Sequence, residues 1–147
     1  MMPSLILDHF IPYRLSVASN AVSARISASY RKRFGLKVPE WRLIAILAEG
    51  GEMTPQALGQ AARIDKISVS RAAAALIERS LVMQRANPGD GRSHLLSLTS
   101  DGASLYAEIA PVALAMEAEL LSGFSDAERR LLDGLLRRIE GAASGVC

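Results

Sequence analysis

The sequence predicts a mainly α-helical chain with one small β-hairpin. Apolar residues recur at intervals of three and four through most of the chain, which is the period of an amphipathic helix. Residues 81–98 depart from that period, because two short apolar runs flank an Asn-Pro-Gly turn. The chain has 147 residues and 50% of them are hydrophobic, so we expect one domain, residues 1–147, with a modest core.

A helix that begins after Asp65 is the central element. Its first-turn amide hydrogens can be accepted by the Asp65 carboxylate. A stripe of residues at helical spacing predicts a buried face: Val69, Ala73, Leu76 and Ser80. We expect the helix to end at Ser80, the last residue of this stripe. Polar residues near the amino end fall largely outside that stripe, as in a helix that presents hydrogen-bonding side chains to DNA: Lys66, Ser68, Ser70 and Arg71.

The segment after this helix predicts a hairpin. An apolar run over residues 81–86 suits a strand. A proline that fixes φ and two glycines that permit positive φ predict a turn over residues 87–92: Pro88, Gly89 and Gly91. A second strand returns through two leucines that both face inward: Leu96 and Leu98. A helix followed by a hairpin with an arginine at its tip has the shape of a winged helix-turn-helix.

Residues 8–34 predict one long helix upstream that starts irregularly because of Pro12 in its first turn, with Gly35 as its carboxyl-terminal cap. The start of this segment, residues 5–13, is too apolar to be left in water, so we expect a partner chain to cover it. Pro39 opens a second helix that a Gly-Gly pair ends.

The dipeptide Thr54-Pro55 predicts the start of a short helix over residues 55–62, the first helix of the helix-turn-helix. After the hairpin, Thr99 caps a predicted helix over residues 99–121, which Pro111 should bend. A capping box at residues 125–128 starts a final helix that reaches about residue 140. That helix carries an apolar stripe suited to packing between helices: Leu131, Leu132, Leu135, Leu136 and Ile139.

The hairpin also carries a specific motif. Asp90 and Arg92 form D-x-R, Leu98 and Thr99 follow as L-T, and Gly102 comes next. This pattern resembles the wing signature of the MarR (multiple antibiotic resistance regulator) family. The sequence departs from the family pattern at residue 80, where a serine stands in place of a common glycine, and in the alanine run 72–75.

The resemblance implies a winged helix-turn-helix over about residues 36–99, flanked by dimerisation helices over about residues 3–34 and 99–143. It implies a homodimer that regulates transcription on double-stranded DNA, with repression as the commoner outcome. A two-fold dimer predicts a pseudo-palindromic operator with half-sites about one helical turn apart.

Roles on DNA follow residue by residue as hypotheses. Arg92 should enter the minor groove, oriented by a hydrogen bond from its guanidinium to Asp90. Lys66 and Arg71 should meet phosphates or guanine edges, and two serines should add hydrogen bonds in the major groove: Ser68 and Ser70. The helix that Thr54 caps should donate backbone amides to a phosphate.

Many MarR-like regulators hold a small, often aromatic or phenolic, effector where the dimerisation helices meet the winged domain. Four residues could line such a site here: His9, Tyr13, Arg14 and Trp41. The alternative is that Trp41 is a core residue, Tyr13 an interface residue and Arg14 a solvated charge.

Other function classes find little support. The two histidines have no second metal ligand at a useful spacing, and no phosphate-binding loop is present, so we expect neither an enzyme nor a metal or cofactor. Residues 1–10 fail as a signal peptide, no apolar run is long enough to span a membrane, and Cys147 stands alone, so we expect a cytoplasmic protein without internal disulfides. The alternative function is a winged helix that binds protein instead of DNA.

Overall fold

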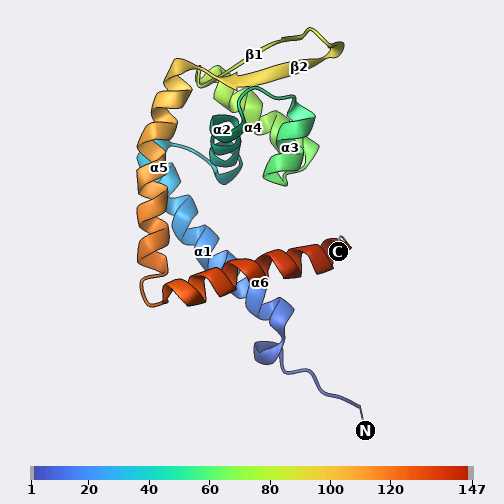
Figure 1. The fold of residues 1–147 in the computed structure, drawn as a ribbon, viewed down its shortest axis with the longest axis vertical. Helices are drawn as coiled ribbons and strands as arrows, with labels where there is room; N and C mark the ends of the chain where they lie inside the picture. Colours follow the sequence, from blue (N-terminus) through green and yellow to red (C-terminus); the bar gives the residue numbers. More distant parts are fainter. Residues whose placement is uncertain (1, 146–147) are drawn as a thin grey trace. The chain divides into compact units, whose positions relative to one another are not determined.

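The computed structural model describes residues 2–145, so Cys147 lies outside the described residues. The elements follow one another along the chain (Figure 1): η1 Leu7–His9, α1 Ile11–Phe34, α2 Val38–Gly50, α3 Pro55–Ala62, α4 Lys66–Glu78, β1 Val82–Asn87, β2 Asp90–Leu98, α5 Ser100–Leu120 and α6 Asp126–Ser144. The chain divides into two compact units, residues 1–109 and 110–147. The predicted fold class, helices with one small hairpin, is confirmed.

The core of the first unit lies where α2, α3 and α4 meet the hairpin. Seven large side chains are fully buried: Leu36, Leu43, Ile44, Leu58, Leu76, Leu96 and Ile109. Val69, Ala73 and Leu76 of the predicted α4 stripe are buried. Ser80 is exposed instead, because α4 ends at Glu78 and Ser80 adopts a left-handed conformation with φ 60°. A glycine adopts that conformation more easily, which explains why one is common there.

The predicted helix starts are confirmed by side-chain caps. Asp65 accepts a hydrogen bond from the Ser68 amide at 2.8 Å, and Thr54 accepts one from the Ala57 amide at 3.1 Å. The capping box of α6 is complete, with the Ser125 hydroxyl and the Glu128 carboxylate each accepting from the other residue's amide. These contacts satisfy first-turn amides that have no partner within the helix.

The upstream helix starts irregularly, as predicted, but residues 8–34 are not one continuous helix. A 3-10 turn over Leu7–His9 is separated from α1 by the extended Phe10. Pro12 gives the reason: its ring lacks an amide hydrogen and would clash with the carbonyl four residues earlier, so α1 can begin only just before it. The last helix runs to Ser144, some four residues beyond its predicted end.

The hairpin has a tighter turn than predicted. Only Pro88 and Gly89 separate β1 from β2, and neither glycine of the tip uses a positive φ. The Asn87 side chain shapes the tip instead, because its amide oxygen accepts from the Gly89 amide and its nitrogen donates to the Ser93 hydroxyl. The strand register shifts between Ala86 and Asn87.

At the base of the hairpin, Leu96 is buried as predicted, whereas Leu98 is only half-buried. Leu96 also pairs with Met53 through two backbone hydrogen bonds of 2.8 and 3.1 Å, which fix the hairpin to the segment before α3.

A second junction joins the hairpin to α5. The Thr99 hydroxyl donates to the Ser80 carbonyl at 2.7 Å and accepts from the Gly102 amide at 3.0 Å. Gly102 is buried directly against the carbonyl of Leu81. This contact leaves no room for a side chain and explains the glycine that follows the L-T motif.

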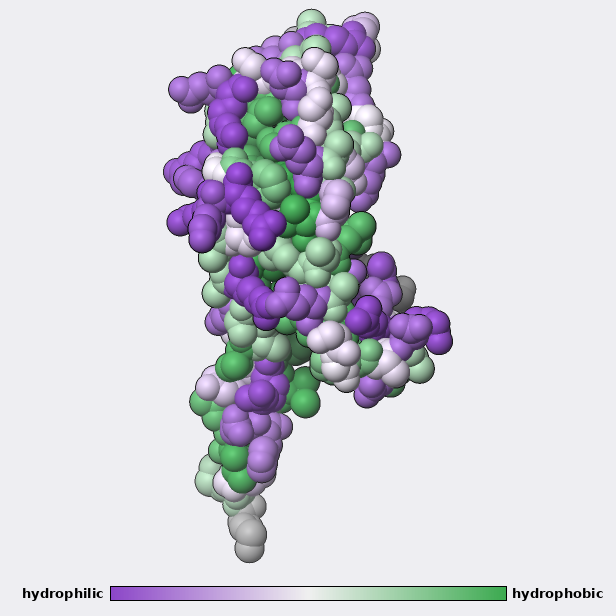
Figure 2. Space-filling model, turned by 90° about the vertical axis from the view of Figure 1, so that its left-hand side faces the viewer, coloured by the Kyte–Doolittle hydropathy of each residue, from purple (hydrophilic) through white to green (hydrophobic). Residues whose placement is uncertain are grey.

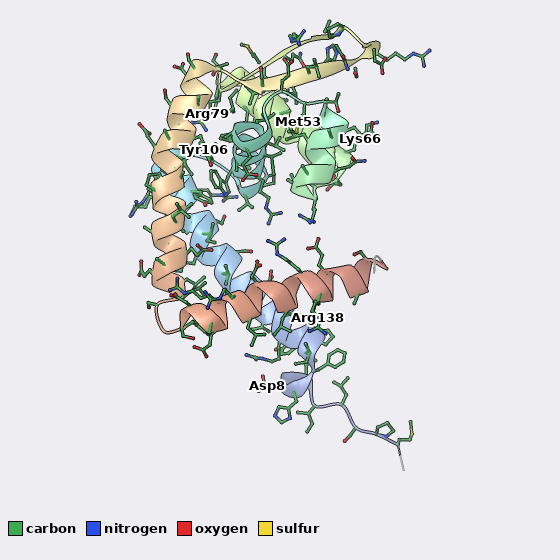
Figure 3. All side chains as sticks on the ribbon, in the orientation of Figure 1. Asp8, Met53, Lys66, Arg79, Tyr106 and Arg138 are labelled. Carbon is green, nitrogen blue, oxygen red and sulfur yellow. The ribbon has the colours of Figure 1, made fainter. Side chains whose placement is uncertain are left out.

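The end of α4 is fastened to the end of α1. The Arg79 guanidinium, labelled in Figure 3, donates to the carbonyls of Phe34 and Gly35, each at 3.2 Å. Gly35 caps α1 with φ 65°, as predicted. The arginine therefore satisfies carbonyls that a helix end leaves without partners.

The second unit contains the end of α5 and all of α6. Its capping box and the Arg129 guanidinium, which donates to the Leu121 carbonyl at 2.9 Å, fix the turn between them. The predicted leucine stripe of α6 is present on the helix but stays exposed in the single chain. Among residues 2–145, no helix is long and apolar enough to cross a membrane.

The packing of Gly102 yields the first prediction. Gly102→Ala should lower the free energy of unfolding by about 1–3 kcal/mol, since the added methyl group must displace the Leu81 carbonyl. Urea unfolding measures the effect. Gly91→Ala is the matched control, because a methyl group there meets nothing. Equal stability of the two variants would contradict the packing argument.

Candidate nucleic-acid interface

The amino end of α4 is held rigidly and presents polar side chains. The Asp65 carboxylate accepts from both the amide and the hydroxyl of Ser68, each at 2.8 Å, and these hydrogen bonds lower the pKa of Asp65. Lys66, Ser70 and Arg71 are exposed. The structure thus places the predicted residues of α4 within its first two turns, although the Ser68 hydroxyl is engaged by the cap.

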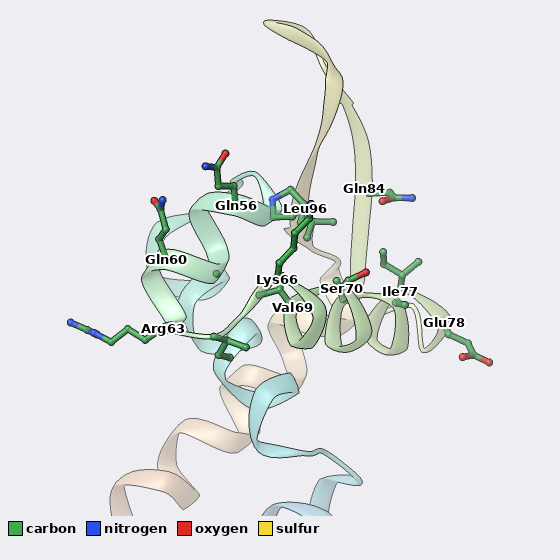
Figure 4. A pocket seen from close by; sticks show the side chains of 15 residues that line it. Gln56, Gln60, Arg63, Lys66, Val69, Ser70, Ile77, Glu78, Gln84 and Leu96 are labelled. Carbon is green, nitrogen blue, oxygen red and sulfur yellow. The ribbon is translucent and has the colours of Figure 1, made fainter. Parts of the chain in front are cut away.

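A groove of about 1040 Å³ opens between α3, α4 and the hairpin (Figure 4). Val69, Ala73 and Leu96 contribute apolar lining, and Lys66 and Ser70 line the α4 side. The groove also has polar residues that sequence reasoning missed: Gln56, Gln60 and Gln84. Gln56 and Gln60 are four residues apart on one exposed face of α3, a spacing that could have revealed them.

The short helix α3 approaches α4 closely. A side chain at Gly59 would meet the Ile64 carbonyl and the Val69 side chain, each at 3.2 Å, so only a glycine fits there without adjustment. Thr54 caps α3 as predicted, which orders the first turn. The helix-turn-helix therefore has the two elements that the sequence assigned to it.

Arg92 is exposed near the tip of the hairpin, as predicted, but its contact with Asp90 differs. The Asp90 carboxylate accepts from the backbone amide of Arg92 at 3.0 Å, so the expected guanidinium contact is wrong. A short carboxylate side chain reaches the amide two residues ahead more easily than a long side chain folds back. Asp90 therefore shapes the backbone that carries Arg92.

Arg85 has a structural contact that the sequence did not reveal. Its guanidinium forms two hydrogen bonds of 2.7 Å with the Glu52 carboxylate, and this arginine lowers the pKa of Glu52. Glu52 precedes α3, whereas Arg85 lies on β1. The pair therefore ties the hairpin to α3 beside the Met53 pairing.

The four predicted effector residues fall into two separate places. His9, Tyr13 and Arg14 are exposed at the start of the chain, where Arg14 pairs with Asp8 at 3.0 Å. Trp41 is half-buried and its ring lies 5.2 Å from that of Tyr30 and 6.2 Å from that of Tyr106. Burial raises the pKa of Tyr30.

The length of α1 keeps these two places apart. Tyr13 precedes Tyr30 by seventeen residues on the same helix, which separates them by about 25 Å along its axis. The four residues therefore do not converge within one chain. Among residues 2–145, no three His, Cys, Asp or Glu side chains are grouped to hold a metal ion.

Comparison with known proteins supports the interpretation of this face. The MarR family model matches residues 34–93, which contain α2, α3, α4 and most of the hairpin. A putative transcriptional regulatory protein for the hcr operon of Thauera aromatica is 28% identical over 97 residues, which are 66% of this chain and 58% of that protein. The match therefore spans less than two thirds of that relative.

Solved structures resemble nearly the whole chain. A MarR/EmrR family transcriptional regulator from Acinetobacter sp. ADP1 is 25% identical with a TM-score of 0.87, covering 97% of this chain and 100% of its own. BpsR of Bordetella bronchiseptica, whose DNA binding is regulated by 6-hydroxynicotinic acid, has a TM-score of 0.88 at 23% identity. The match covers 94% of this chain and 98% of BpsR.

The family-model match falls on the winged helix-turn-helix, and the structural likeness extends over the flanking helices. The sequence therefore resembles the MarR family over the winged helix-turn-helix, and the whole fold is similar to that of solved MarR-family transcriptional regulators.

Proposed function

We propose that this protein is a DNA-binding transcriptional regulator of the MarR type, and that it acts as a homodimeric, ligand-responsive repressor on a pseudo-palindromic site in duplex DNA. The observation that carries the proposal is the groove between α3, α4 and the hairpin. The polar start of α4 lies on one side of this groove, and the exposed Arg92 lies near the tip of the hairpin that forms another side. Because its partner is DNA, we expect the protein to act in the cytoplasm.

The winged domain, about residues 36–99, would contact two grooves of the duplex. In the major groove, Lys66 and Arg71 of α4 would meet phosphates or guanine edges, and Ser70 would add a hydrogen bond. Ser68 would contribute its backbone more than its hydroxyl, which Asp65 already engages. In the first turn of α3, the Gln56 amide would face a phosphate, since Pro55 has no amide hydrogen and the amides of Ala57 and Leu58 donate to Thr54.

Arg92 would enter the minor groove beside the major-groove contact. A guanidinium is attracted there because narrow A·T-rich segments concentrate negative potential. Asp90 supports this role indirectly, since its hydrogen bond to the Arg92 amide fixes the backbone at the point where the strand register is irregular. Irregular pairing of this kind, near the end of a strand, changes the direction in which a side chain points.

Two apolar surfaces support the homodimer. Large side chains are exposed along the N-terminal segment, whose hydrophobic surface is green in Figure 2: Met2, Leu5, Ile6, Leu7, Phe10 and Ile11. On α6, five side chains of one stripe are 39–62% exposed: Leu131, Leu132, Leu135, Leu136 and Ile139. A monomer seldom leaves so much apolar surface in water, so residues 3–34 and 99–143 are proposed to pack against a second copy.

Repression and a ligand response complete the proposal. A dimer bound across a promoter would exclude polymerase. An aromatic effector such as a hydroxylated aromatic acid would bind beside Trp41, with His9, Tyr13 and Arg14 supplied by the second chain, because one chain cannot bring all four together. The regulation of BpsR, a protein of similar fold, by 6-hydroxynicotinic acid motivates this choice of probe.

Arg92→Ala should weaken binding to a duplex selected from a random pool at least tenfold, because each wing loses a contact of about 1–3 kcal/mol. The slope of log affinity against log salt should become shallower by about two, one charge per wing. Fluorescence anisotropy at several salt concentrations measures both. The exposed Arg42 on α2 provides the control variant, Arg42→Ala. An unchanged affinity and slope for Arg92→Ala would refute the wing assignment.

Leu136→Glu should convert the dimer to a monomer, because it places a charge in the proposed apolar contact of α6. Sedimentation equilibrium would give twice the chain mass for the unmodified protein and one chain mass for the variant. Arg130→Glu, on the opposite face of α6, should remain dimeric. A monomeric unmodified protein would contradict the homodimer.

An effector should alter the fluorescence of Trp41, which is the only tryptophan of the chain. Titration with 6-hydroxynicotinic acid and related hydroxylated aromatic acids should give a saturable change, and Arg14→Ala should weaken it by removing the cation that meets the carboxylate. A flat response across the panel would count against this effector site.

A further inference from the structure

The outward face of α4 is not uniformly polar. Ile67, in the first turn, has 64% of its surface exposed. Ile67, Arg71, Ala74 and Glu78 follow one another at helical spacing, and all four are exposed. An apolar side chain thus alternates with a charged one along the stripe that lies opposite the buried face.

The stability of the single chain does not account for Ile67. A β-branched residue is a poorer helix former than alanine or lysine, and an exposed isoleucine gains little by burial. The exposed isoleucine lies between two cationic residues, Lys66 and Arg71, which favour a polyanionic partner at this point. A partner that binds this part of α4 must therefore offer apolar groups beside phosphates.

Duplex DNA offers one apolar group in the major groove, the C5 methyl of thymine. We infer that Ile67 and Ala74 read thymine methyl groups and thereby set the base preference of α4, an inference that rests on the proposed function. Neither side chain can donate or accept a hydrogen bond, so neither can distinguish bases by any polar edge.

The spacing of the two residues adds a geometric constraint. Seven residues separate Ile67 from Ala74, which places them about 10 Å apart along the axis of α4. Because a helix in the major groove is inclined to the axis of the duplex, that distance corresponds to at most about three base-pair steps of 3.4 Å. The exposed Ala74 and the half-buried Ala75 have short side chains, so base edges can approach the middle of α4 closely. Each half-site should therefore contain two thymines, on either strand, separated by no more than about three base-pair steps.

The test uses the full-length protein and a duplex that it selects from a random pool. Each thymine of a half-site is replaced in turn by deoxyuridine, which removes only the methyl group, and the change is made symmetrically in both half-sites. Affinities are measured for the unmodified protein, Ile67→Ser and the conservative control Ile67→Val. Circular dichroism confirms that each variant keeps its helices.

One symmetric replacement should weaken binding of the unmodified protein about fifteenfold, since each lost methyl contact contributes a factor of about four. At one of the two thymines, the one that Ile67 contacts, Ile67→Val should stay sensitive to the replacement, whereas Ile67→Ser should bind the thymine and deoxyuridine duplexes equally. At the other, which Ala74 contacts, all three proteins should stay sensitive. Deoxyuridine effects that are absent, or that are the same in Ile67→Ser at every thymine, would overturn the inference. If Arg92→Ala still weakens binding in that case, the proposed function survives. Failure to select any duplex would overturn both.

Discussion

The burial of one face of α4 is the constraint on which the rest of the structure depends. Val69 and Leu76 enter the core formed with α2 and α3, and this packing forces the opposite face outward. The hydrogen bonds of Asp65 then fix where the helix begins, so the outward residues keep a defined position. The exposure of the surface proposed to face DNA is therefore a consequence of core packing, and small residues such as Gly59 make that packing possible.

Contacts at the base of the hairpin also fix the position of the wing. Met53 pairs with Leu96, and Glu52 binds Arg85, so the hairpin and α3 form one framework. The groove keeps its shape because both its walls are fixed to the same short segment before α3. At the other end of α4, Arg79 joins the helix to the end of α1. A movement of α1 could thereby be transmitted to the recognition helix.

Local signals made much of the fold predictable, because a cap and its partner lie three residues apart. Asp65, Thr54 and Ser125 each accept from the amide three residues ahead, as their positions indicated. Long-range contacts left no such signal: Glu52 and Arg85 are 33 residues apart. The four proposed effector residues do not meet within one chain, because the length of α1, which chemistry alone does not indicate, separates Tyr13 from the surroundings of Trp41. The contact of Asp90 with the Arg92 backbone was missed because side-chain charge was considered before backbone geometry.

Hydroxyl-radical footprinting of the full-length protein on a selected duplex tests the central claim most directly. A two-fold dimer that uses α4 and the wing predicts symmetric protection of two half-sites, with centres about 10 base pairs apart or a multiple of that distance. Protection of the flanking minor grooves should accompany it, where each Arg92 enters. A single asymmetric patch, or the absence of protection at concentrations that saturate the duplex, would contradict the account.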